Sequence, residues 1–201
     1  NKYLFEGNFR VDGSSKFLPG HRYGFFPSVA LGWRFTEEGF INSFTSKFLT
    51  QGKLRVSYGG LGNNSGIGRY EQQPTLATSN YIIANGVTSG FVNAKIINQA
   101  LTWEKTSVLN IGLDLGFLDN RLTAELDYYD RLTTGMLRPS QMSLLLTGAY
   151  NAPESNIGDM RNRGIEATIS WKDRIGKDIT YGLSLNGSYN SNTLEKWNEQ
   201  L

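Results

Sequence analysis

The stretch LTWEKTSVLNIGLDLGFLDNRLTAELDYYDRL, residues 101–132, decides how this chain folds. Reading every second residue separates an apolar set from a polar set. The apolar set is Leu101, Trp103, Leu109, Ile111, Leu113, Leu115 and Phe117, and the polar set is Thr102, Glu104, Thr106, Asn110, Gly112, Asp114 and Gly116. After FLDNRL the alternation resumes with Leu122, Ala124, Leu126 and Tyr128 on the apolar side. A period of two is typical of a β-strand with two unlike faces, so this stretch predicts two strands joined by a tight turn.

The same alternation recurs along the rest of the chain. It is found in KYLFEGNFRVD (2–12), YGFFPSVALGWRF (23–35), KLRVSYGGL (53–61), GIEATISWK (164–172) and ITYGLSLNGSY (179–189). We therefore expect about seven strands, most of them near the ~9–11 residues that a tilted strand needs to cross a bilayer.

The connections between these strands alternate between short and long. FLDNR and DRIGKD are predicted to be tight turns, and residues 37–51 a moderate turn with a short helical piece. The segments 62–99 and 133–162 are predicted to be long loops. Such alternation places the long loops at one end of the sheet, as in outer-membrane β-barrels.

Composition excludes several classes of function. The 201 residues include no cysteine and a single histidine, and the formal net charge is only +2 with acids and bases interspersed. Disulfides, thiol catalysis, cysteine zinc sites and a nucleic-acid surface are therefore not expected. His21 has no neighbouring metal ligand in the sequence, and Ser14 and Ser15 lack the glycine spacing of a nucleophile elbow. We expect no metal, no cofactor and no enzymatic activity.

The apolar strand faces fit either a protein core or lipid. A soluble β-sandwich would show the same alternation, because one face packs on a core and the other meets water. Aromatic residues near strand ends favour lipid, since tyrosine and tryptophan prefer the bilayer–water interface. The candidate membrane-interface aromatics are Tyr3, Tyr23, Trp33, Trp103, Trp171 and Tyr181. An open sheet in lipid would leave unpaired edges, so further strands outside this chain are expected.

Several motifs, in this order, resemble those of a known family. They are YLFEGNFRVDGSSKF (3–17), RYGFFPSVALGWRF (22–35), KLRVSYGGLGNN (53–64), LTWEKTSVLNIGLDLGFLDNRL (101–122), DYYDRLTTGML (127–137) and NIGDMRNRGIEATISW (156–171). The chain resembles the SusC/RagA-type TonB-dependent outer-membrane transporters. The resemblance implies an all-β fold in which residues 1–201 form an antiparallel transmembrane β-barrel segment of a barrel with 22 strands.

The resemblance also implies a function. In this family a plug domain precedes the barrel, TonB drives its movement, and a SusD-like surface lipoprotein closes the mouth. Neither the plug nor the remaining strands are expected in this chain, which would supply barrel wall and outer loops in the outer membrane of a Bacteroidota-like bacterium. Oligosaccharides or peptides are the implied substrates.

The long loops carry the candidate contact residues. Tyr70, Tyr81, Phe91 and Tyr150 are candidates for contact with the substrate or the lid, or they pack within their own loops. A soluble all-β carbohydrate-binding domain remains the alternative to the transporter at this point.

Overall fold

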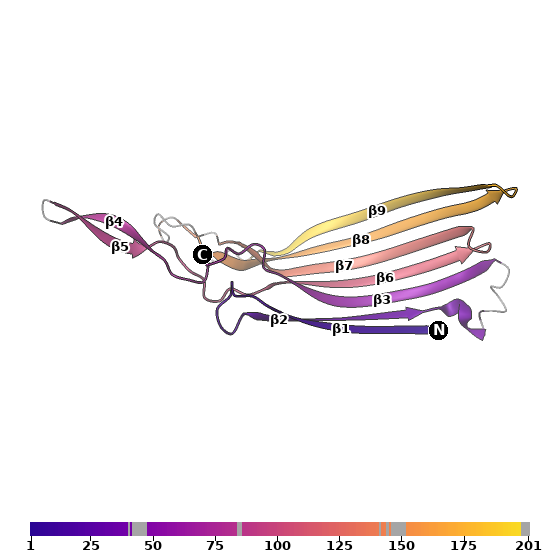
Figure 1. The fold of residues 1–201 in the computed structure, drawn as a ribbon, viewed down its shortest axis with the longest axis horizontal. Coiled ribbons are helices and arrows are strands. Elements are labelled where there is room, and N and C mark those ends of the chain that lie inside the picture. The colour runs from indigo at the N-terminus through magenta and orange to yellow at the C-terminus, as the bar shows by residue number, and fades with distance from the viewer. Residues whose placement is uncertain are drawn as a thin grey trace.

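The computed structural model describes residues 1–39, 41, 48–83, 86–140, 142–143, 145 and 152–197. They form a seven-stranded antiparallel sheet in the order β1-β2-β3-β6-β7-β8-β9 and a separate hairpin, β4-β5 (Figure 1). The sheet strands are β1 Tyr3–Gly13, β2 Tyr23–Trp33, β3 Leu49–Asn63, β6 Glu104–Phe117, β7 Leu122–Pro139, β8 Glu154–Ile175 and β9 Ile179–Trp197. The hairpin strands are β4 Leu76–Ile83 and β5 Gly86–Asn93, and a short 3-10 helix, η1, spans Phe35–Glu37. The expected all-β fold with seven main strands is confirmed.

The register joins the apolar faces of all seven strands into one surface. Leu54 pairs with Leu113, and Leu113 pairs with Leu126. Leu126 in turn pairs with Ala167. Because directly paired residues point to the same side of a sheet, the alternation within each strand becomes one continuous apolar side. We call this side the outer face, and the polar side the inner face.

The two ends of the sheet differ in their connections (Figure 1). At one end lie the β6–β7 turn, where Leu118, Asp119 and Asn120 have positive φ, and the β8–β9 turn, where Gly176 has φ 65°. At the other end lie the connections 14–22, 64–103 and 140–153. We call these the short-turn end and the long-loop end. The connection 34–48 between β2 and β3 also lies at the short-turn end and is longer than 14–22. Both tight turns therefore lie at one end as predicted, but short and long connections are not fully separated.

Both long loops are shorter in the structure than predicted, because parts of them form strands. Segment 62–99 contains the hairpin β4-β5, which projects beyond the sheet (Figure 1). In segment 133–162, β7 continues to Pro139 and β8 begins at Glu154. A register shift between Thr133 and Met136 interrupts the alternation there, which explains why these extensions do not read as strand. Among the described residues, no helix has the length and apolarity that a membrane crossing requires.

Candidate functional site

The outer face is uncovered along its whole length. Phe9 on β1 is 78% exposed, and Leu183 on β9 is 73% exposed. No second sheet or helical layer lies over this face within the part of the chain that the structure describes (Figure 1). Soluble monomers rarely expose contiguous apolar surface on this scale. The outer face is therefore suited to contact lipid, and none of the described segments forms a second layer that would bury it.

Charged pairs border the apolar part of the outer face. On β8, the outward-facing residues Ile165 to Trp171 are all uncharged, and Arg163 and Asp173 lie beyond them at the two ends. Arg163 pairs with Asp130 at 3.0 Å, and Asp173 pairs with Arg121 at 3.6 Å. The ten residue steps from Arg163 to Asp173, at about 3.3 Å each and tilted by about 40°, correspond to a height of ~25 Å between the bordering charges. This matches the apolar band of an outer-membrane barrel.

At the short-turn end, two predicted interface aromatics share one polar partner. Tyr3 and Trp33 are paired across β1 and β2. The Tyr3 hydroxyl donates to Glu38 Oε1 at 2.6 Å, and Trp33 Nε1 donates to the same oxygen at 3.4 Å. Lys2 Nζ lies 3.4 Å from Glu38 Oε2. The polar tips of both rings thus share Glu38 as their hydrogen-bond partner, which leaves the apolar parts of the rings on the outer face.

This arrangement predicts a pH-dependent contribution of Glu38 to stability. The hydrogen bond from the Tyr3 hydroxyl, followed by those from Trp33 and Lys2, holds the pKa of the Glu38 carboxyl below its usual range. A lowered folded-state pKa stabilises the protein above the unfolded pKa, and this stabilisation is lost as pH falls through the folded pKa. In thermal unfolding of the detergent-solubilised barrel, we expect Glu38→Gln to be less stable than wild type at neutral pH. The two should converge once the pH falls below the lowered pKa of Glu38. A difference that is independent of pH would contradict this assignment.

The other candidate interface aromatics occupy three kinds of position. Trp171 and Tyr181 lie on the outer face near the short-turn end, where Trp171 pairs with Leu122 and Tyr181 pairs with Asp173. Tyr23 begins β2 at the long-loop end and is 78% exposed. Trp103 differs from the expectation, because the residue is only 8% exposed and its ring contacts protein.

Trp103 belongs to a buried group at the long-loop end, which we call the loop cluster. Its members are Phe17, Phe26, Ile67, Leu101, Trp103 and Leu137. The Trp103 ring lies 5.2 Å from that of Phe17 and 5.8 Å from that of Phe26. Its Nε1 donates to the carbonyl of Arg22 at 3.2 Å. The connections 14–22 and 64–103 therefore fold together over the inner face of the sheet.

Asn156 joins the loop cluster to the strands. Its side-chain oxygen accepts from the Thr102 N–H at 2.9 Å, and its nitrogen donates to the carbonyls of Thr102 and Gly135 at 3.0 and 2.8 Å. Gly135 adopts a left-handed φ of 62° at the irregular part of β7, a conformation that favours glycine. One amide thus fixes the segment before β6 onto β7 and β8.

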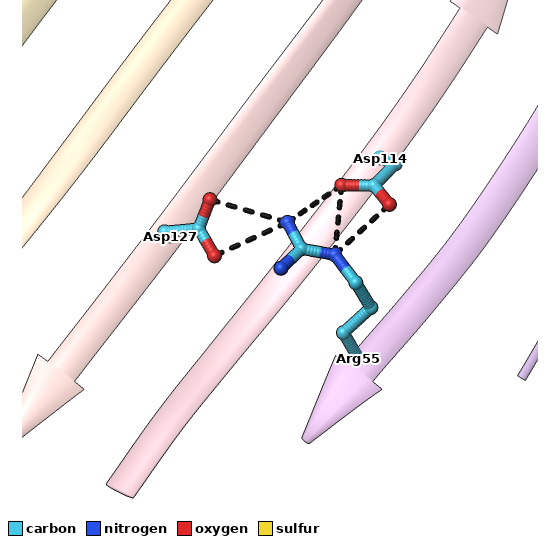
Figure 2. A network of polar contacts seen from close by, with 3 residues as sticks. All are labelled: Arg55, Asp114 and Asp127. Carbon is cyan, nitrogen blue, oxygen red and sulfur yellow. Dashed lines mark hydrogen bonds and ion pairs between the residues drawn. The ribbon is translucent and has the colours of Figure 1, made fainter. Parts of the chain in front are cut away.

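The middle of the inner face carries an ion-pair network (Figure 2). Arg55 on β3 donates from Nε and Nη2 to Asp114 on β6, at 2.9 and 2.7 Å. The same Nη2 donates to Asp127 on β7 at 3.2 Å. Charge-assisted, forked contacts of this kind are the stronger class of protein hydrogen bond. The network links three neighbouring strands on the side that faces away from lipid.

Gly112 makes room for this network, and its replacement is predicted to destabilise the sheet. Gly112 lies between Arg55 and Asp127 in the register, and a Cβ there would approach the Arg55 guanidinium to 2.6 Å. Gly112→Ala should cost about 1–2 kcal/mol in the free energy of unfolding, because the partly exposed charged contacts would be displaced. Gly182→Ala is the matched control, since its Cβ would meet Lys172 at an ordinary 3.5 Å. Equal stability of the two variants in detergent would contradict the prediction.

The loop aromatics are brought together only in part. Tyr81 and Phe91 lie on the hairpin β4-β5, 41% and 72% exposed, but Tyr81 pairs with Thr88 and Phe91 pairs with Thr78. This register places them on opposite faces of the hairpin. Tyr70 lies in the connection between β3 and the hairpin and is 65% exposed. Tyr150 lies outside the described residues.

The hairpin carries no charged side chain and exposes several apolar ones. On one face lie Leu76, Ile82, Val87 and Phe91, each at least 67% exposed. Neither β4 nor β5 pairs with a strand of the main sheet. A two-stranded hairpin without a partner is marginally stable, and uncharged open edges favour pairing with another chain. The hairpin therefore has the properties of a docking element.

The sequence profile of the family described as "TonB dependent receptor-like, beta-barrel" matches residues 1–200. The chain belongs to this family. The TonB-dependent receptor SusC of Bacteroides thetaiotaomicron is 35% identical over 200 residues, which are 98% of this chain and 20% of that protein. The TonB-dependent receptor P3 of Formosa agariphila is 33% identical over 196 residues, 98% of this chain and 19% of the relative.

Solved structures agree with this assignment. The RagAB peptide importer in its "closed-closed" state matches with a TM-score of 0.81 and 30% identity, over 96% of this chain and 20% of that chain. The importer in its "open-open" state matches with a TM-score of 0.80 and 31% identity, over the same shares of the two chains. The present chain therefore spans about a fifth of the TonB-dependent receptors that it resembles. The expectation of a barrel segment is confirmed, and a soluble carbohydrate-binding domain is not favoured.

Sequence reasoning missed the residues that organise the inner face. Arg55, Asp114 and Asp127 all lie on predicted polar faces, but their partnership depends on the register of three strands. The hairpin could have been found, because Asn85-Gly86 within YIIANGV is a strong hairpin signal.

Proposed function

We propose that this chain forms part of the wall and mouth of an outer-membrane transporter that imports nutrients in a TonB-dependent manner. The substrates are oligosaccharides or peptides. A plug domain outside this chain contacts TonB, and a SusD-like surface lipoprotein covers the mouth in a Bacteroidota-like outer membrane. The observation that carries the proposal is the single-layer sheet, whose outer face is apolar over ~25 Å and whose inner face is polar. The protein performs transport and no covalent chemistry.

Uptake by the intact transporter tests this proposal. Deleting its gene from the native bacterium should abolish growth on the imported nutrient, and deleting TonB should have the same effect. Restoring the gene should restore growth. Import that continues at the wild-type rate without TonB would contradict the proposed mechanism.

Within this function, we assign lid contact to the hairpin β4-β5. Its exposed residues lie at the long-loop end, which is the extracellular end in barrels of this architecture. Tyr70 and Tyr150 remain candidate contacts to substrate or lid.

Paired substitutions on the hairpin are predicted to weaken lid binding. Replacing Tyr81 and Phe91 with alanine removes large side chains from both faces, and large aromatic side chains contribute strongly to protein interfaces. We expect at least a tenfold loss in the amount of lipoprotein that co-purifies with the intact transporter. Replacing Thr78 and Thr88, their register partners, with alanine provides the control. Unchanged co-purification in the aromatic variant would remove this role.

A further inference from the structure

An open hollow of about 550 Å³ lies on the inner face, close to the long-loop end of the sheet. It is lined by Tyr129 and Arg131 of β7, Asn162 and Glu166 of β8, and Asn190 and Asn192 of β9. Asn110 of β6 extends it beside Tyr129, with which it pairs in the register. We call this the wall hollow. Its volume lies within the range typical of small-ligand sites.

The polar side chains of the wall hollow carry hydrogen-bonding groups that the described residues of this chain do not use. Within the described part of the chain, none of the side chains of Arg131, Asn162, Glu166, Asn190 and Asn192 makes a hydrogen bond or ion pair. In the neighbouring network, in contrast, Arg55 uses both Nε and Nη2 to bind Asp114 and Asp127. Amides, a guanidinium and a carboxylate together offer both donors and acceptors in one place. Such a set fits a ligand that is rich in groups that both donate and accept.

Tyr129 provides an aromatic surface within this polar set. A Cβ at Gly164 would lie 2.5 Å from Tyr129 Cζ and from the hydroxyl oxygen, so the ring occupies the space above this glycine. Gly164 on β8 is the register partner of Tyr129 on one side and of Asn190 on β9 on the other side. The glycine lets the ring lie across the strand, and the ring remains half-exposed to the inner side.

The chemistry of the wall hollow favours a sugar over a peptide. A pyranose ring presents an apolar face that packs on an aromatic ring, and its hydroxyls both donate and accept hydrogen bonds. Peptide side chains would need apolar subsites, and Val108 is the one aliphatic residue lining the hollow. We propose that the wall hollow binds one sugar unit of an oligosaccharide during import, with Tyr129 as the stacking platform. This inference rests on the proposed transport function.

A depletion experiment in the native bacterium tests the inference. Cells carrying the intact transporter, or lacking its gene, are fed oligosaccharides from partial acid hydrolysis of mixed polysaccharides, together with a tryptic digest of casein. Mass spectrometry of the medium identifies the components whose removal depends on the transporter. The same mixture is then given to cells carrying Tyr129→Ala, Tyr129→Phe, Gly164→Val or Asn190→Ala. Asn8→Ala, on the inner face outside the hollow, is the matched control for Asn190→Ala.

We expect transporter-dependent removal of oligosaccharides. At equal amounts of heat-modifiable protein in the outer membrane, Tyr129→Ala and Gly164→Val should slow removal at least tenfold and Asn190→Ala severalfold. Tyr129→Phe and Asn8→Ala should stay near wild type. Unchanged oligosaccharide removal in Tyr129→Ala and Asn190→Ala would overturn the sugar site and leave the transport function standing. If only the removal of peptides depends on the transporter, the sugar site is likewise overturned and the transport function stands. If no component depends on the transporter, the proposed function fails, and the inference fails with it.

Discussion

Replacing Ile169 with arginine is expected to destabilise the folded barrel by about 2–4 kcal/mol, because the new charge would face the middle of the bilayer. Ile169 lies on the outer face of β8, between the bordering charges Arg163 and Asp173. It is 49% exposed in the isolated chain and has no protein layer above it. Urea-induced unfolding of the intact barrel in phospholipid vesicles measures this difference directly.

The neighbouring Thr168 provides the control, because it faces the inner side. Thr168 pairs with Glu125 on β7 and with Asn186 on β9, both on the polar face. Thr168→Arg should therefore change the free energy of unfolding by less than about 1 kcal/mol, since the inner face is hydrated. A Thr168→Arg variant that is destabilised as strongly as Ile169→Arg would show that the two faces are not in different environments.

Replacing Trp103 with alanine is expected to open the loop cluster at a cost of about 3–5 kcal/mol, the usual range for removing a buried tryptophan. The ring contacts Phe17 and Phe26, and its indole N–H holds the carbonyl of Arg22. The loss should be local, because the strand pairing of the main sheet does not depend on this contact. Amide hydrogen exchange in residues 14–22 should accelerate by about two to three orders of magnitude.

Trp171→Ala is the control that shows whether faster exchange comes from losing a buried ring or from losing any tryptophan. Trp171 is also a tryptophan but lies on the outer face, paired with Leu122. Its replacement should leave exchange in residues 14–22 at the wild-type rate. Equal acceleration in both variants, or none in Trp103→Ala, would contradict the role given to the loop cluster.

The sequence predicted those parts of the fold that depend on local pattern. Alternation alone placed Leu109 to Leu115 and Ile165 to Trp171 on one side of their strands, and the register confirms this surface. The two tight connections between alternating runs were also predicted, and left-handed residues such as Asn120 and Gly176 are found in them. These features could be predicted because each is determined by residues close together in the sequence.

Other features depend on contacts between distant segments. Trp103 continues the apolar alternation of β6, yet it packs against Phe17 because a loop 86 residues earlier in the chain folds over it. The Tyr129 ring lies over Gly164 only once β7 and β8 are in register. Periodicity within one segment does not indicate which distant residues become partners. The inner-face site therefore could not be predicted from the sequence.

Site-directed spin labelling along β8 tests the central claim, that the outer face contacts lipid and the inner face lines a hydrated lumen. Single cysteines would be placed at each of residues 164–172 of the intact transporter in lipid, and the chain itself contains no cysteine. Labels at Ile165, Ala167, Ile169 and Trp171 should collide frequently with oxygen, which partitions into lipid. Labels at Glu166, Thr168 and Ser170 should favour a water-soluble nickel relaxant. Equal accessibility at odd and even positions, or odd positions shielded from oxygen, would contradict a transmembrane barrel wall.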